Sequence, residues 1–71
     1  SKQHQNPDWT NLPVFTNDSD AVRFFQRFGE VRYVETAAKV PTCHSYTFTS
    51  FDGAIRRKIT IWENGSIFIP R

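Results

Sequence analysis

The sequence predicts a small α+β domain in which one helix packs on one face of a three- to four-stranded antiparallel β-meander. Asp52-Gly53 and Asn64-Gly65 each stand between runs of alternating apolar and polar residues, and such dipeptides are the strongest short-range hairpin signals. Upstream, residues 18–28 carry apolar side chains at helical spacing. We expect a disordered tail over residues 1–8 and a single domain over residues 9–71, since the first six residues include no apolar side chain.

The segment before the helix contains Trp9 and Leu12, but prolines interrupt it. We expect an extended segment that covers part of a sheet face or adds a short strand. The helix should begin after the N-cap residue Asn17, and Gly29 should supply the left-handed conformation that ends many helices. Its apolar face has the spacing i, i+1, i+4, i+7 and needs a sheet to pack on. This face consists of Ala21, Val22, Phe25 and Phe28.

Residues 31–36 alternate and predict a strand that leaves the helix, and residues 39–42 form the connection to the next strand. If Asp52-Gly53 is a two-residue type I′ turn, Ser50 faces Ile55 and the register of the first hairpin follows by counting outward. Alternation then sorts the pairs onto two faces of the sheet. The first face carries His44, Tyr46, Phe48, Ile55, Arg57, Ile59 and Ile61, and the second carries Ser45, Thr47, Thr49, Arg56, Lys58 and Thr60.

A two-residue turn at Asn64-Gly65 would place Ile61 opposite Phe68, so that Phe68 joins the first face under the helix. Trp62, Ile67 and Ile69 would then lie on the second face beside Cys43. Pro70 suits an edge strand, and that edge could pair with a second copy of the chain to give a homodimer.

Composition limits the function classes. The net charge is only +2, but residues 39–71 hold five basic and two acidic side chains, whereas residues 1–38 hold four basic and five acidic ones. One cysteine excludes an internal disulfide and favours an intracellular setting, either cytoplasmic or nucleoid/nuclear. No apolar run is long enough to span a membrane. The absence of methionine indicates a processed product or an excised domain.

The titratable residues do not predict an enzyme. Cys43 and His44 are adjacent on a strand, so their side chains point to opposite faces and cannot form a nucleophile–base pair. One cysteine with His4 and His44 does not supply the ligands of a zinc site. The three glycines are turn and cap residues, so no phosphate loop is present. We therefore expect no catalytic residue, metal or cofactor, with His44 as a satisfied core-edge histidine and Cys43 as a small apolar residue.

Two stretches resemble parts of RNA-recognition-motif domains. Residues 24–34 are similar to the first helix and second strand of that family, and residues 44–51 to its aromatic third strand. The resemblance implies that Tyr46 and Phe48 stack on bases. It covers about a third of the chain and ends at Phe51, because an alternating strand follows where the family has its second helix. In the register given above, Tyr46 and Phe48 instead lie under the helix.

Three interpretations of the second face remain open. It could bind nucleic acid (DNA or RNA) through Arg56 and Lys58, with Thr47 and Thr49 as hydroxyl partners and Trp62 as a stacking surface. It could instead dock a protein through an apolar patch of Trp62, Ile67, Ile69 and Cys43. The third interpretation is that the segment around Trp9 and Leu12 folds across this face and makes it core.

Overall fold

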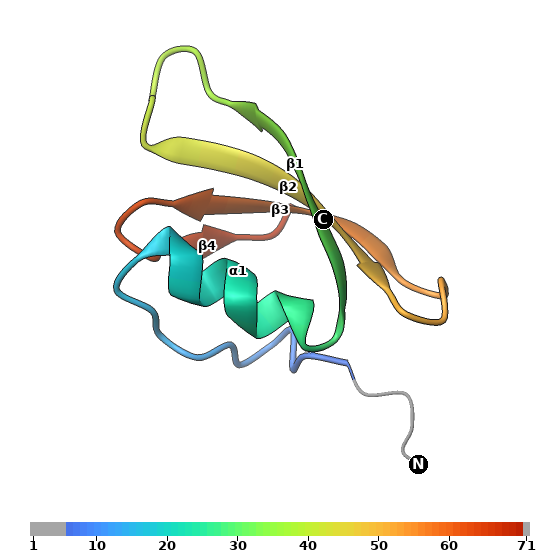
Figure 1. The fold of residues 1–71 in the computed structure, drawn as a ribbon. Coiled ribbons are helices and arrows are strands. Elements are labelled where there is room, and N and C mark those ends of the chain that lie inside the picture. The colour runs from blue at the N-terminus through green and yellow to red at the C-terminus, as the bar shows by residue number, and fades with distance from the viewer. Residues whose placement is uncertain (1–5, 71) are drawn as a thin grey trace.

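The structure, a computed structural model, describes residues 6–70 and has the predicted α+β arrangement (Figure 1). One helix is followed by four strands that pair antiparallel in the order β1-β2-β3-β4, as expected of a meander. The elements are α1 (Asp18–Gln26), β1 (Gly29–Thr36), β2 (Cys43–Ser50), β3 (Arg56–Trp62) and β4 (Ile67–Phe68).

The helix begins where the sequence predicts and ends earlier. Asn17 is the N-cap, and its Oδ1 accepts a hydrogen bond of 2.8 Å from the backbone N–H of Asp20. The prediction that Gly29 ends the helix in a left-handed conformation is wrong, since Gly53 and Gly65 alone have positive φ among the described residues. Gly29 instead opens β1, where an added Cβ would lie against the carbonyl oxygen of Thr49. The close approach of two strands therefore requires glycine here.

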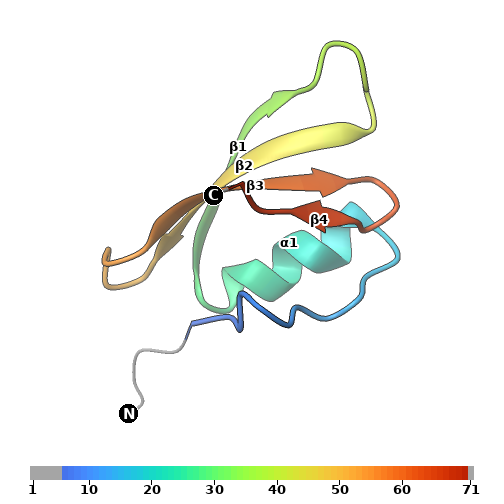
Figure 2. The same cartoon turned by 180° about the vertical axis from the view of Figure 1, so that it is seen from behind.

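The core lies between α1 and one face of the sheet. Phe25 from the helix and Phe48, Ile59 and Ile61 from β2 and β3 are fully buried. Figures 1 and 2 show that the N-terminal segment runs along the same side of the sheet as α1. The core cluster also takes in Ala21, with Trp9, Leu12 and Phe15 packed against it.

Trp9 is the main contact of the N-terminal segment. Its ring stacks on Phe25 at 5.7 Å between centroids and meets Phe48 edge-on at 5.4 Å. The guanidinium of Arg57 lies 4.9 Å from the Trp9 centroid, which confirms that Arg57 points to the helix-packed face. The expectation that this segment covers the second face is therefore wrong. Pro7 is buried although it lies within the predicted tail, and residues 1–5 lie outside the described residues.

The predicted register of the first hairpin is confirmed at every pair from Cys43 with Trp62 to Thr49 with Arg56. The turn type differs from the prediction, because no described residue other than glycine has positive φ. The Asp52 carboxylate replaces that geometry by accepting hydrogen bonds from Ser50 Oγ at 2.6 Å and from the Ala54 N–H at 3.0 Å. Four residues still separate Ser50 from Ile55, so the register is unchanged.

The register of the second hairpin differs from the prediction by one residue. Ile61 pairs with Ile67, and Thr60 pairs with Phe68. The Trp62 N–H donates to the Ser66 carbonyl at 2.9 Å, and Gly65 has a φ of +93°, so this loop has three residues with glycine in the left-handed position. The predicted positions of Phe68, Ile67 and Ile69 are therefore wrong. Phe68 lies on the face opposite the helix, while Ile67 and Ile69 pack against the core.

Both edges of the sheet carry features that oppose pairing with another strand. The strand predicted over residues 31–36 is present as β1, and a bulge interrupts its register between Tyr33 and Glu35. Strand β4 has only two residues and is followed by Pro70. Bulges, short edge strands and proline are the usual means by which edges avoid aggregation. The predicted homodimer through this edge stays a prediction.

Candidate functional site

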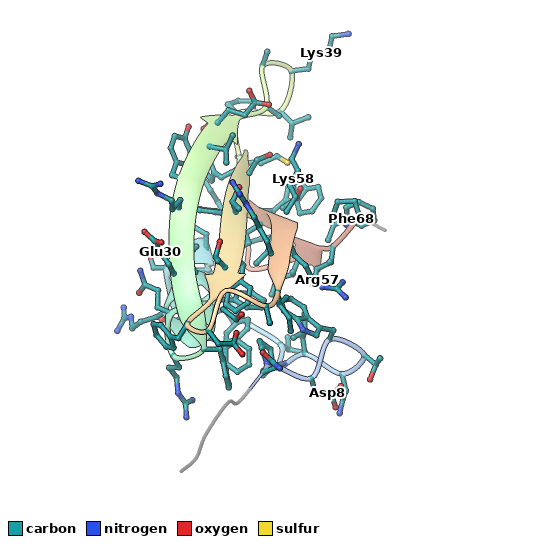
Figure 3. All side chains as sticks on the ribbon, turned by 90° about the vertical axis from the view of Figure 1, so that its right-hand side faces the viewer. Asp8, Glu30, Lys39, Arg57, Lys58 and Phe68 are labelled. Atoms are coloured by element: carbon teal, nitrogen blue, oxygen red, sulfur yellow. The ribbon has the colours of Figure 1, made fainter. Side chains whose placement is uncertain are left out.

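The sheet face turned away from α1 is not covered by the helix or by residues 6–17, both of which pack on the other side (Figures 1 and 2). We call it the open face. The side chains of Glu30, Lys58 and Phe68, which belong to it, can be followed on β1, β3 and beside β4 in Figure 3. By their pairing, the side chains that belong to the open face are Glu30, Arg32, Glu35, Cys43, Ser45, Thr47, Thr49, Arg56, Lys58, Thr60, Trp62 and Phe68.

Three cations lie toward the end of the open face near the β2–β3 turn. Arg56 and Lys58 are exposed, and within residues 6–70 neither makes an ion pair. They are two residues apart on β3, about 7 Å along the strand. Arg32 lies across β2 from Lys58, about 10 Å away by the strand spacing, and its Nε is 3.7 Å from Glu30 Oε2. The cations are thus spread over two strands.

Hydroxyl groups lie between these cations. Thr47 is paired with Arg32 on one side and with Lys58 on the other, and Thr49 is paired with Glu30 and Arg56. Threonine side chains both donate and accept hydrogen bonds, so this area can contact phosphate or sugar oxygens. The surface here is a shallow concavity lined by Glu30, Arg32, Tyr33, Val34, Thr47, Thr49 and Arg56.

Two aromatic rings occupy the other part of the open face. Trp62 is partly buried at the end of β3, whereas Phe68 is 56% exposed. Phe68 pairs with Thr60, which makes it the diagonal neighbour of Trp62 at about 7–8 Å. The sequence predicts Trp62 on this face and does not predict Phe68 there. The missing signal is the length of the Asn64-Gly65 loop, which decides the face of every residue in β4.

The apolar docking patch predicted from the sequence does not form. Ile67 and Ile69 pack against the core on the helix side. Cys43 is paired with Trp62 as predicted, but only 9% of it is exposed. Of the four residues predicted for this patch, Trp62 is therefore the one that is partly accessible on the open face.

A chain of polar contacts centres on His44. The Nδ1 atom of His44 is 2.9 Å from Thr36 Oγ1, and its Nε2 is 3.0 Å from Glu63 Oε2. Asp18 Oδ2 lies 4.0 Å from the same Nε2, and Tyr33 OH is 2.6 Å from Thr36 Oγ1. Both ring nitrogens thus have partners at the core edge. Among residues 6–70, no group of three histidine, cysteine or carboxylate side chains could hold a metal ion.

Burial raises the pKa of Tyr46 above its ordinary value of 10.0, and the nearby charges of Asp18 and Tyr33 add to this effect. The neutral phenol is therefore favoured in the folded state, and this stabilisation is lost as the pH rises through the folded-state pKa. We expect one tyrosine to ionise later than free tyrosine in an alkaline titration followed by ultraviolet absorbance. Tyr46→Phe should remove that late phase, and a late phase that persists would contradict this assignment.

The positions of Tyr46 and Phe48 do not match the base-stacking role that the partial resemblance implies. Phe48 is fully buried, and Tyr46 packs against the core on the helix side. Comparison with known protein families, curated proteins and solved structures gives no match to this chain. In the part of the chain that the structure describes, no helix is long and apolar enough to cross a membrane.

Proposed function

We propose that the open face binds single-stranded nucleic acid. The observation that carries this proposal is the register of β4, which puts Phe68 on the same face as Trp62 and turns Ile67 and Ile69 toward the core. A face that would otherwise present aliphatic side chains therefore presents two rings. Rings combined with a cationic surface are the usual elements of single-strand binding, because every base has a face that can stack.

The cations and rings of the open face are suitably arranged along β3. Lys58 and Trp62 are four residues apart, about 13 Å along the strand, and Thr60 lies between them. A single strand that follows β3 can place phosphates on Arg56 and Lys58 and bases on the two rings. The side chains of Arg56 and Lys58 make no ion pair within residues 6–70, so phosphate binding breaks no existing pair there.

The protein-docking alternative for this face is less well supported, since its patch has lost Ile67, Ile69 and the accessibility of Cys43. We also propose an intracellular setting for the protein. The free, buried thiol of Cys43 supports this setting, because such cysteines are usual in reducing compartments.

Binding to fluorescently labelled oligothymidine and oligouridine, measured by anisotropy over a range of salt concentrations, tests the proposal. In the double variant Arg56→Ala/Lys58→Ala the log–log salt slope should fall by about 1.4, since each phosphate contact to a single strand contributes about 0.7. Phe68→Ala should weaken binding by about 1–3 kcal/mol with the slope unchanged, because stacking releases no counterions. Phe68 is a suitable position because its exposed side chain contributes little to the core.

The matched control is Arg23→Ala/Arg27→Ala, which removes the same charge from the exposed surface of α1. This variant should change the salt slope little. If the salt slope fell equally in the two double variants, the attraction between the protein and the oligonucleotide would depend only on the net charge of the protein. An unchanged slope in Arg56→Ala/Lys58→Ala, or no binding of either oligonucleotide at low salt, would refute the proposal.

A further inference from the structure

A second surface lies on the opposite side of the molecule from the open face, between α1 and the segment that precedes it. It is a shallow, mostly apolar groove, which we call the helix groove. The residues that line the groove are Phe15, Asp20, Arg23, Phe24 and Arg27. Phe15 comes from the N-terminal segment, and the other four have the helical spacing i, i+3, i+4, i+7.

The aromatic rings of this region pack against the core but remain partly accessible. Phe25 is fully buried, whereas Phe24, Phe15 and Phe28 are only partly buried. The Phe24 ring lies 5.5 Å from Phe15 and 5.2 Å from Phe28, so the three form one continuous cluster. Charged side chains, those of Asp20, Arg23 and Arg27, lie along the border of this apolar surface.

The rim of the helix groove is cationic at one end. Arg23 and Arg27 are one helical turn apart, and like charges at this spacing repel each other. Within residues 6–70, Arg27 makes no ion pair, and its guanidinium lies 5.9 Å from the Phe28 centroid. Arg23 reaches Asp20 only at 3.9 Å, and its side chain is 76% exposed. Carboxylates from a partner would therefore relieve the repulsion between the two arginines.

The other end of the groove carries the acidic residue Asp20, whose carboxylate already contacts Asn17 and Arg23. Asp20 Oδ2 accepts a hydrogen bond of 3.2 Å from the Asn17 side chain, and Oδ1 faces Arg23. The groove is therefore polarised, and the cation that makes no ion pair within residues 6–70 lies at the Arg27 end. A ligand with carboxylates near Arg27 and an apolar side chain over Phe24 would match both the charge and the shape of the site.

We propose that the helix groove docks an acidic segment of a protein partner. The segment lays an aliphatic or aromatic side chain over the touching rings of Phe15 and Phe24 and places carboxylates against Arg23 and Arg27. A side chain suits this groove better than successive stacked bases, because the rings of Phe15 and Phe28 are tilted by 50° and 61° to that of Phe24 and form no flat platform. This site is independent of nucleic-acid binding on the open face.

Titration of the isotopically labelled domain with a short synthetic peptide of Glu, Leu and Phe, followed by two-dimensional NMR, tests this proposal. Saturable shifts should be confined to Phe15 and residues 20–28, with none at Thr47 or Lys58. A control peptide with Lys in place of Glu should bind at least about tenfold more weakly than the acidic peptide. The variant Arg23→Glu/Arg27→Glu should reverse this preference, and both positions are exposed, so the fold should be retained.

Several results would overturn the proposal. These are the absence of saturable shifts with the acidic peptide, equal binding of the two peptides, and shifts that map to the open face. Oligothymidine that shifts residues 20–28 and competes with the peptide would assign the groove to nucleic acid instead. Each of these results differs from a failure of the open-face proposal, which would show as lost oligonucleotide binding while peptide binding to the groove is retained.

Discussion

Phe25→Ala is expected to lower the free energy of unfolding by about 3–5 kcal/mol, as is usual when a buried ring is removed. The Phe25 side chain is fully buried between the stacked ring of Trp9 at 5.7 Å and the ring of Phe48 at 6.1 Å. Both neighbours belong to other elements, so neither can collapse fully into the space. Typical stabilities of about 0.05–0.15 kcal/mol per residue imply about 4–11 kcal/mol for a chain of this length. The variant should therefore lose much of its stability.

Arg23→Ala is the control for Phe25→Ala on the same helix. Its side chain is 76% exposed and has only the 3.9 Å contact with Asp20, so the change in stability should stay within about 0.5 kcal/mol. Urea denaturation followed by circular dichroism compares the two variants with the parent. Similar losses in both would show that α1 is rotated from the orientation described here.

The first hairpin was predictable because two strands carry the same information independently. Phe48 and Tyr46 on one strand and Ile59 and Ile61 on the other fix the buried face, and a slip of one residue would move one of these two sets to the exposed face. The error in turn type had no effect on this result. The Asp52 carboxylate stabilises the turn by hydrogen bonds in place of the predicted type I′ backbone conformation, and the number of residues in the connection is the same.

The second hairpin carried no such redundancy. Residues 67–69 are all apolar, so alternation does not distinguish their two faces, and the observed β4 has only two residues. The register therefore depended on the loop alone, and Asn64-Gly65 is compatible with loops of two or three residues. Because of this ambiguity in loop length, the sequence-based prediction put Phe68 in the core and Ile67 and Ile69 on the open face, the reverse of the observed positions. The sequence consequently predicted Arg56, Lys58 and the threonines of the candidate site, but it did not predict Arg32 or the second ring, Phe68.

Contacts between residues far apart in the sequence could not be predicted from local sequence patterns. The sequence alone does not pair Trp9 with Arg57, or bring Glu63 to His44. Gly29 illustrates the same limit, since a glycine after a helix favours a left-handed end and only the tertiary fold shows the approach of the Thr49 carbonyl. The order of the elements was predictable from the sequence, whereas the position of the N-terminal segment required the structure.

Gly65→Ala is expected to be the most damaging change of a single methyl group. Gly65 has a φ of +93° and is buried, and an added Cβ would lie against the carbonyl group of Phe15 and 2.9 Å from the backbone nitrogen of Asn17. Backbone strain costs about 1–3 kcal/mol, and overpacking adds about 1–3 kcal/mol. The expected loss is therefore about 2–6 kcal/mol, because the obstruction is backbone next to the helix N-cap and not the end of a flexible side chain.

Gly53→Ala separates the two contributions to the Gly65→Ala loss. Gly53 also has a positive φ, of +76°, but no atom lies within 4 Å of the position that its Cβ would occupy. This variant should lose only the strain, about 1–3 kcal/mol. Thermal and urea unfolding of the two variants should differ by the cost of the contact with Phe15. If both variants lost the same stability, the N-terminal segment could not pass over the β3–β4 turn. The loss in Gly65→Ala would then equal the backbone strain alone, as at any left-handed turn position.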